Sequence, residues 1–352
     1  PPPSPTLSDD RRQRQMCIRD RAEGELFHDL LMVKRARLGE TRAGKPYLVL
    51  TLGDRSGEIS GPVWEKAEAY QETFVPGVVA QVKAVVQTYN DKLQLRIDTL
   101  SLADERSYKS DDFVAASHRG GETMQRELTK LIGAIQNDFL RSLLTRIFLQ
   151  SDIGTMYRVS PAAKGIHHAY MGGLLEHSLS MAKVSLLLAD HYEGIDSDLL
   201  VCGALLHDIG KTVELQSETG VIDYTDPGRL KGHLVIGCEI IGREAQQIKG
   251  FPDDLLTQLQ HLVLSHHGRQ EFGSPVVPMT AEALLLSFID DMDAKMNLEE
   301  QLRRKVKTGG RKWSDYQRSL ERYLLLTPLE DRQEEPHNFQ DDSIRTKQRS
   351  LF

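Results

Sequence analysis

Seven potential metal-binding side chains are dispersed between Gly173 and Asp291, so a fold that uses them together must bring five segments to one centre. They are His177, the doublet His207 and Asp208, His233, the doublet His266 and His267, and Asp290. Nine of the chain's twelve histidines fall between His167 and His267. Imidazole nitrogen and carboxylate oxygen together suit borderline divalent ions such as Zn, Mn, Fe or Co. The set predicts a metal centre, and a metal-dependent hydrolase is the leading interpretation.

Helical periodicity surrounds these residues. Apolar side chains recur every three or four positions, which is typical of amphipathic helices. The pattern predicts one long helix over 122–149 and further helices over 168–192, 197–209, 232–248, 253–267, 280–305 and 313–325. Facing helices of a bundle can build a metal site from inward-pointing side chains. Seven ligands exceed what one site with an open position for water can use, so two ions are expected.

An earlier part of the chain, from Glu25 to Ala103, has the period of β-strands instead. Five alternating segments, with one short helical insertion around Glu65 to Thr73, are separated by turn residues. This arrangement predicts a small Greek-key barrel of the OB type, a fold that binds oligonucleotides.

Basic and aromatic residues of this region are candidates for contact with nucleic acid. Five cations fall in one twelve-residue window, in the expected connection between strands 1 and 2: Lys34, Arg35, Arg37, Arg42 and Lys45. Tyr47, Trp64 and Tyr89 could stack on bases, which tolerates any sequence. Trp64 could equally close the barrel core. Lys45 and Tyr47 are the stronger candidates.

The fold class is therefore multidomain α and β, with a five-stranded OB-type barrel followed by an all-α helical bundle. The run QRQMCIRDR over 13–21 resembles translated adapter sequence, and residues 1–21 are expected to be a non-native or disordered segment outside the fold. The expected divisions are an OB domain over 22–104, a polar linker over 105–121, an all-α domain over 122–328 and a flexible polar tail over 329–352.

Composition indicates the class of protein and its cellular compartment. The hydrophobic fraction of 39% and the charged fraction of 27% are those of an ordinary soluble protein. No window approaches 18 consecutive apolar residues, so no membrane span is expected. Cys17, Cys202 and Cys238 form neither a disulfide framework nor a CxxC metal site. The natural compartment is a reducing cytoplasm.

Several motifs carry a family resemblance. They are KGIHHAYMGGLLEHSLSMA, LLHDIGK, LSHHG and DDMDAKM, preceded by TRAGKPYLVLTLGDRSGEISGPVW. Together they resemble the YhaM-type 3′-to-5′ exoribonucleases, which are HD-domain metallophosphohydrolases with an N-terminal OB fold. The resemblance covers roughly 24–326. The HDxGK motif alone is moderately specific, whereas the complete ordered set with the barrel is strongly specific.

The resemblance implies stepwise hydrolysis of single-stranded RNA from its 3′ end to nucleoside 5′-monophosphates. Two divalent ions are expected, with Mn first and Co or Fe as alternatives. Asp208 would bridge them, with His177, His207 and Asp290 on one ion and His233, His266 and His267 on the other. Lys211 would neutralise a phosphate oxygen beside the catalytic Asp208.

Other polar residues near these motifs receive weaker assignments. His168 precedes the first ligand and could contact substrate. We expect Asp291 and Asp293 to be supporting or surface groups, and His191 and His261 to be structural.

Three alternatives stay open. One is an HD hydrolase of a small nucleotide or cyclic dinucleotide, although the GYP signature of the cyclic-dinucleotide branch is missing after His267. The second is a non-catalytic nucleic-acid-binding adaptor, against which all seven ligand positions are filled. The third is a nuclease acting on single-stranded DNA, since a 2′-hydroxyl contact cannot be recognised in a sequence. A homo-oligomer is also conceivable, because the apolar stripe of 122–149 could face a partner subunit.

Overall fold

The computed structural model describes residues 18, 21–90, 92–164, 168–217, 221–304, 306 and 310–327, without the side chains of 110 and 111. The expectations for 1–17, including Cys17, and for the tail over 329–352 lie outside this range. The chain divides into two compact units, with the boundary between Ala294 and Lys295. Within the described range, none of the helices has the length and apolar character needed to cross a membrane.

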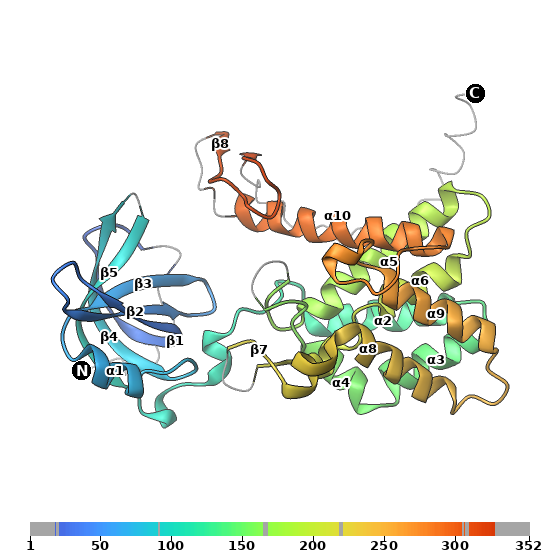
Figure 1. The fold of residues 1–352 in the computed structure, drawn as a ribbon, viewed down its shortest axis with the longest axis horizontal. Helices are drawn as coiled ribbons and strands as arrows, with labels where there is room; N and C mark the ends of the chain where they lie inside the picture. The colour runs from blue at the N-terminus through green and yellow to red at the C-terminus, as the bar shows by residue number, and fades with distance from the viewer. Residues whose placement is uncertain are drawn as a thin grey trace, which may run out of the picture. The chain divides into compact units, whose positions relative to one another are not determined.

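The first part of the chain forms one curled antiparallel sheet with the strand order β3-β2-β1-β4-β5, shown in blue to cyan in Figure 1. Its strands are β1 (Leu26–Glu40), β2 (Pro46–Gly53), β3 (Glu58–Val63), β4 (Val79–Tyr89) and β5 (Lys92–Leu102), and α1 (Ala67–Thr73) follows β3. The two ends of the sheet approach each other at Gly61, where a Cβ would lie 2.5 Å from the Leu95 carbonyl oxygen. The predicted strands and helical insertion are confirmed.

Alternation along the strands builds the core of this sheet. Leu48, Leu50 and Leu52 occupy every second position of β2 and are fully buried, because side chains two apart on a strand share one face. Ile18, from the segment that was left out of the fold, is also buried against this core. Trp64 is 53% exposed, so the suggestion that it closes the core is wrong.

The second part is helical and shares a single apolar core. Its helices, seen in Figure 1, are α2 (Gly121–Ala134), α3 (Asp138–Leu149), α4 (Asp152–Val159), α5 (Gly173–His191), α6 (Ser197–Leu206), α7 (Lys211–Glu214), α8 (Asp226–Ala245), α9 (Asp253–Ser265) and α10 (Ala281–Arg303). A short hairpin of β6 (Leu215–Gln216) and β7 (Asp223–Tyr224) follows α7. The predicted order of a β-domain and an all-α domain is confirmed.

The long helix predicted over 122–149 is wrong, because the chain breaks between α2 and α3. Asn137 caps α3 by accepting hydrogen bonds from the backbone of Phe139 and Leu140. Asp198 accepts from the backbone N–H groups of Gln136 and Asn137, at 2.8 and 2.7 Å, which satisfies the two donors at the break. The apolar stripes of both helices are buried in the protein's own core.

Two further differences concern short segments. The helix predicted over 313–325 is wrong: this region contains a small hairpin of β8 (Lys312–Trp313) and β9 (Leu325–Leu326). Trp313 is 64% exposed and Tyr323 60%, so these rings do not form the buried apolar face that a helix here would need. Residues 168–172 precede α5 instead of opening it, because Gly172 has a φ of +77°.

Candidate metal centre

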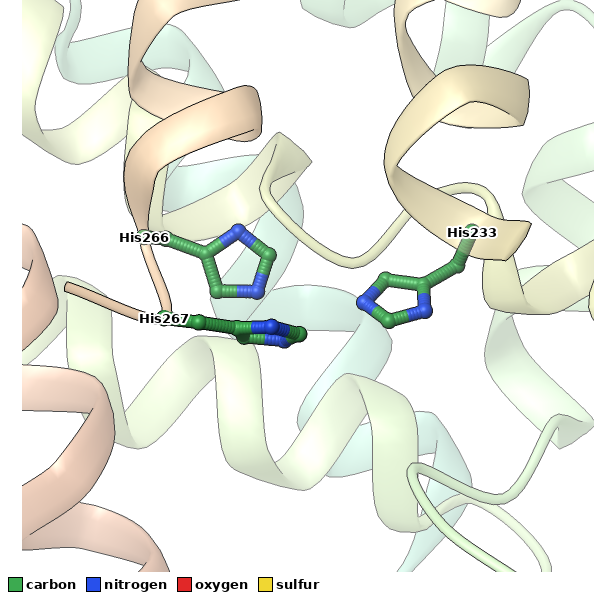
Figure 2. Close-up of side chains that lie close together, drawn as sticks. All are labelled: His233, His266 and His267. Atoms are coloured by element: carbon green, nitrogen blue, oxygen red, sulfur yellow. The ribbon is translucent and has the colours of Figure 1, made fainter. Parts of the chain in front are cut away.

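Five helical segments bring all seven predicted ligands together. His177 is buried in the second turn of α5, and His207 and Asp208 follow the last turn of α6. His233 lies in α8, His266 and His267 follow α9, and Asp290 lies in α10. In Figure 2 the rings of His233, His266 and His267 point into one shared space. The predicted convergence is confirmed in space.

Two glycines make this approach possible. At Gly210 an added Cβ would lie 2.0 Å from the carbonyl oxygen of His233, so only glycine lets the turn after Asp208 pack against α8. Gly232 has a φ of +73° and interrupts α8 immediately before His233. Glycine adopts this left-handed conformation without the steric cost of a side chain. The glycine of the HDxGK motif therefore has a packing role.

One group of donors surrounds His207. The Nε2 atom of His177 lies 3.2 Å from Nε2 of His207 and 3.2 Å from Oδ1 of Asp290. The Nε2 atom of His207 is 3.3 Å from Oδ2 of Asp208. Donor atoms of His177, His207 and Asp208 all lie within 4.8 Å of one another, as do those of His207, His266 and Asp290.

The other group faces the second oxygen of Asp208. Donor atoms of His233, His266 and His267 lie within 4.8 Å of one another. Oδ1 of Asp208 is 3.5 Å from Nε2 of His233 and 3.7 Å from Nε2 of His266. The two oxygens of Asp208 therefore face different histidines, Oδ2 towards His207 and Oδ1 towards His233 and His266.

A hydrogen bond at Nδ1 orients each of the five histidines. The oxygen acceptors and their distances are Asp293 Oδ2 for His177 (2.7 Å), the Ala204 carbonyl for His207 (3.0 Å), Glu214 for His233 (3.2 Å), the Val263 carbonyl for His266 (2.7 Å) and the Phe272 carbonyl for His267 (3.0 Å). Because these oxygens accept, Nδ1 carries a proton and Nε2 is the atom that faces the centre. A histidine held in this way can bind a metal ion through Nε2 once that atom carries no proton.

Two buried atoms at the centre fit a cation. Asp208 is 2% exposed, and its Oδ1 has no hydrogen-bond partner among the described residues. The same holds for Nε2 of His233. Unpartnered buried polar atoms are costly and call for an explanation such as an ion. The residues present therefore fit divalent metal ions.

The electrostatics keep the carboxylates ionised. Burial alone would raise the pKa of Asp208, but Lys211 and His207 outweigh it and hold this pKa well below its ordinary value. Burial likewise opposes ionisation of Asp290, yet the hydrogen bond from His177 and the charge of His207 lower the pKa of Asp290. The centre thus presents two carboxylates ready to bind a cation.

The histidines differ in their protonation. Burial lowers the pKa of His266 well below its usual value and also lowers the pKa of His267. Burial acts on His177 in the same direction, but hydrogen bonds to Asp290 and Asp293 raise the pKa of His177 to about 9. His266 and His267 are therefore neutral ligands, whereas a metal at His177 must displace a proton.

Residues behind the ligands were less visible in the sequence. Glu214 was missed; its only sequence signal is an acid placed seven residues after His207. Asp293 was expected as a supporting or surface group, and it contacts His177 directly. His168 is 3% exposed, with Nε2 3.1 Å from Oδ2 of Asp293 and Nδ1 2.9 Å from the Tyr170 hydroxyl. His168 therefore lies behind Asp293, and its suggested substrate contact stays a prediction.

The predicted nucleic-acid contacts in the β-domain fall into two groups. Lys34, Arg35 and Arg37 lie within β1, so their placement in the strand 1–2 connection is wrong. Lys34 is half-buried and donates to the Phe113 carbonyl at 2.8 Å, and Arg35 pairs with Glu58. Two cations do lie in the connection, Arg42 and Lys45, and both are exposed.

Exposed aromatic rings are present where stacking was predicted. The rings of Tyr47 and Trp64 stack on each other, with centroids 4.9 Å apart and planes inclined by 29°. Gly39 makes room for this pair, because a Cβ there would lie 2.7 Å from Cζ of Tyr47. Tyr89 is 63% exposed at the end of β4. The β-domain therefore has exposed aromatic rings at Trp64 and Tyr89 that could stack on bases.

Comparison with known families agrees with both domains. The family model described as HD domain matches residues 174–295, which contain all seven proposed ligands. The model described as OB-fold nucleic acid binding domain matches residues 32–103, which contain β2 to β5 and most of β1.

Curated relatives match most of the chain. The 3′-5′ exoribonuclease YhaM of Geobacillus sp. (strain WCH70) is 35% identical over 287 residues, which are 81% of this chain and 87% of that protein. The 3′-5′ exoribonuclease YhaM of Bacillus subtilis (strain 168) is 33% identical over 287 residues, covering 81% of this chain and 90% of that protein. No solved structure matches the chain significantly. From these identities and coverages, the chain belongs to the YhaM family of HD-domain proteins with an OB fold.

Proposed function

We propose that this protein is a metal-dependent 3′-to-5′ exoribonuclease that hydrolyses single-stranded RNA to nucleoside 5′-monophosphates. The observation that carries the proposal is the position of Asp208, whose two oxygens face separate groups of histidines. The names of the curated relatives support the reaction and its direction.

The seven ligands would hold two divalent ions, with Mn as the first choice and Co or Fe as alternatives. His177, His207 and Asp290 would hold one and His233, His266 and His267 the other, with Asp208 between them. When bound, such ions activate water as a nucleophile and neutralise charge that develops on a phosphate. The contacts of Asp208 support this division, because its Oδ2 faces His207 whereas its Oδ1 faces His233 and His266.

Lys211 supplies a fixed positive charge at the same place. Its Nζ lies 2.6 Å from Oδ2 of Asp208, and its side chain is only 13% exposed. Burial would lower the pKa of Lys211, but the charge of Asp208 raises it above its ordinary value, so the amine stays protonated. A buried ammonium beside the centre would draw in a phosphate and offset its negative charge.

The β-domain would bind the single strand. Cations such as Arg42 and Lys45 attract the backbone, and Tyr47, Trp64 and Tyr89 offer stacking surface that tolerates any base. RNA binding should therefore show weak sequence preference and a marked loss at high salt. Single-stranded DNA stays an alternative substrate.

The remaining assignments are also proposals. We assign the nucleic-acid-binding part to 22–104 and the hydrolase to 122–328. The cytoplasm is the proposed compartment because the three cysteines suggest no disulfide framework, and Cys202 and Cys238 are free thiols.

Replacing Asp208 with Ala tests the proposal. Manganese-loaded wild type should release mononucleotides from 5′-labelled single-stranded RNA, shortening it from the 3′ end. Asp208→Ala should abolish hydrolysis and leave RNA affinity unchanged, because the β-domain is intact. The matched control is Asp190→Ala, an exposed acid on α5. Retained turnover by Asp208→Ala in metal-defined buffer would reject the proposal, and faster degradation of DNA than of RNA would favour the alternative substrate.

A further inference from the structure

Two carboxylates accept hydrogen bonds from histidines of the metal centre, Asp293 from His177 and Glu214 from His233. Oδ2 of Asp293 accepts from Nδ1 of His177 at 2.7 Å. Both oxygens of Glu214 lie 3.2 Å from Nδ1 of His233. The other three histidines are held by backbone carbonyls, which carry no full charge. Each proposed ion therefore has one ligand with an anionic partner.

Asp293 is itself held rigidly. Its Oδ1 accepts from the hydroxyl of Ser180, and its Oδ2 also faces Nε2 of His168 at 3.1 Å. The ring of His168 continues through a 2.9 Å hydrogen bond to the hydroxyl of Tyr170. A carboxylate fixed from three directions can orient a histidine ring with little freedom to move.

Glu214 holds the backbone as well as the ring of its histidine. Its Oε1 accepts from the backbone N–H of His233 at 3.0 Å, immediately after the left-handed Gly232. The carbonyl of Glu214 accepts from the backbone N–H of Thr225 at 2.9 Å. The side chain is 10% exposed, so water competes little for these contacts. Glu214 therefore fixes where α8 resumes and where His233 points.

We propose that Asp293 and Glu214 are positioning residues for different ions, an inference that rests on the proposed two-ion centre. A carboxylate that accepts from Nδ1 fixes the tautomer and makes Nε2 a better donor, and loss of such a partner weakens metal binding by about 10–100-fold. Among the seven proposed ligands, the hydrogen bonds of Asp293 reach His177 and those of Glu214 reach His233. Each substitution should therefore lower the binding affinity for one ion and leave the affinity for the other unchanged.

Metal titration of the full-length protein separates the two effects. Metal-depleted wild type, Asp293→Asn, Glu214→Gln and the double variant would be titrated with Mn²⁺ by calorimetry, with bound metal counted after gel filtration. Each single variant should keep one binding event and lose about 10–100-fold affinity in the other. The double variant should weaken both events. Glu239→Gln, at an exposed position on α8, is a control that should bind like the wild type.

The outcomes distinguish this inference from the function on which it rests. A wild type that binds fewer than two ions would overturn the two-ion centre itself. A wild type that binds two, with single variants that keep both affinities or weaken both events equally, would overturn the positioning roles alone. Ser180→Ala removes one hydrogen bond to Asp293 without changing its charge, and it should lower the affinity for the same ion by a smaller factor. If circular dichroism shows that Asp293→Asn is misfolded, Ser180→Ala replaces it in the titration.

Discussion

At the scale of single residues, the centre depends on side chains whose direction is set by their neighbours. The sequence identifies all seven proposed ligands, because histidines and acids in otherwise apolar helices are conspicuous. Glu214 and Asp293 were not distinguished in this way, since acids near a helix end look the same whether they face solvent or a ligand. What separates them is burial, and burial depends on packing between distant segments.

Lys211 provides a prediction at this scale. Lys211→Gln removes the buried charge beside Asp208 and keeps a side chain of similar length, so metal content should stay at the wild-type level. The kcat for RNA should fall by about 10²-fold, the usual cost of removing one group that stabilises developing charge. Steady-state kinetics with parallel metal analysis would measure both quantities. Lys249→Gln, at an exposed position, is the control; an unchanged kcat in Lys211→Gln would exclude a catalytic role.

At the scale of helices and strands, period and turn chemistry predicted most elements. The five strands and the helices that carry the ligands follow from apolar spacing, which needs no knowledge of the rest of the fold. The break after α2 was missed although Asn137, which caps α3, is of a residue type favoured at helix starts. The second contact at the break could not be predicted, because Asp198, which accepts from the backbone of Gln136 and Asn137, lies more than sixty residues away. The hairpin of β8 and β9 was misjudged because its aromatic residues mimic a helical stripe.

An ion-pair cluster between elements gives a pH-dependent prediction. Glu127 on α2 binds both Arg119, which precedes the helix, and Lys183 on α5. Burial would raise the pKa of Glu127, but Lys183 and Arg119 lower it below its ordinary 4.5. The contribution of the ionised carboxylate to stability is therefore complete above pH 4.5 and is lost as the pH falls through the lower, folded-state pKa.

Urea unfolding of wild type and Glu127→Gln would measure this contribution. The difference in free energy of unfolding should be largest at pH 7 and shrink steadily between pH 5 and pH 3. Glu193→Gln, in the turn after α5, should show no such trend. A difference that does not change with pH would mean that packing of the side chain, and not its charge, stabilises this junction.

At the scale of the whole molecule, one chain carries the candidate metal centre and the proposed strand-binding surface. The centre would bind metal and the cleaved end of the RNA, and it would contact little of the remaining strand. The exposed aromatic rings and cations of the β-domain would give affinity for RNA without sequence preference. Loss of either should therefore leave the other measurable by itself.

Trp64 tests this separation. Trp64→Ala removes the exposed half of the pair with Tyr47, and stacking on a base is worth about 1–3 kcal/mol. The affinity for a single-stranded RNA should fall roughly tenfold, while metal content and cleavage of a dinucleotide stay unchanged. Fluorescence anisotropy at several salt concentrations should give the same salt dependence as the wild type, because no charge is lost. Tyr192→Ala, an exposed ring at the end of α5, is the control; equal affinities for both variants would remove Trp64 from the RNA surface.

Two histidines of the centre also cap the helices that precede them. His207 donates to the Ala204 carbonyl in the last turn of α6, and His266 donates to the Val263 carbonyl in the last turn of α9. Carbonyl groups at the end of a helix otherwise lack an intrahelical partner. A mutation at either histidine would therefore fray a helix terminus as well as remove a nitrogen donor. A related protein that has lost hydrolysis would still need both imidazoles for the stability of its helices. The presence of these two histidines alone is therefore weak evidence that such a protein is an active enzyme.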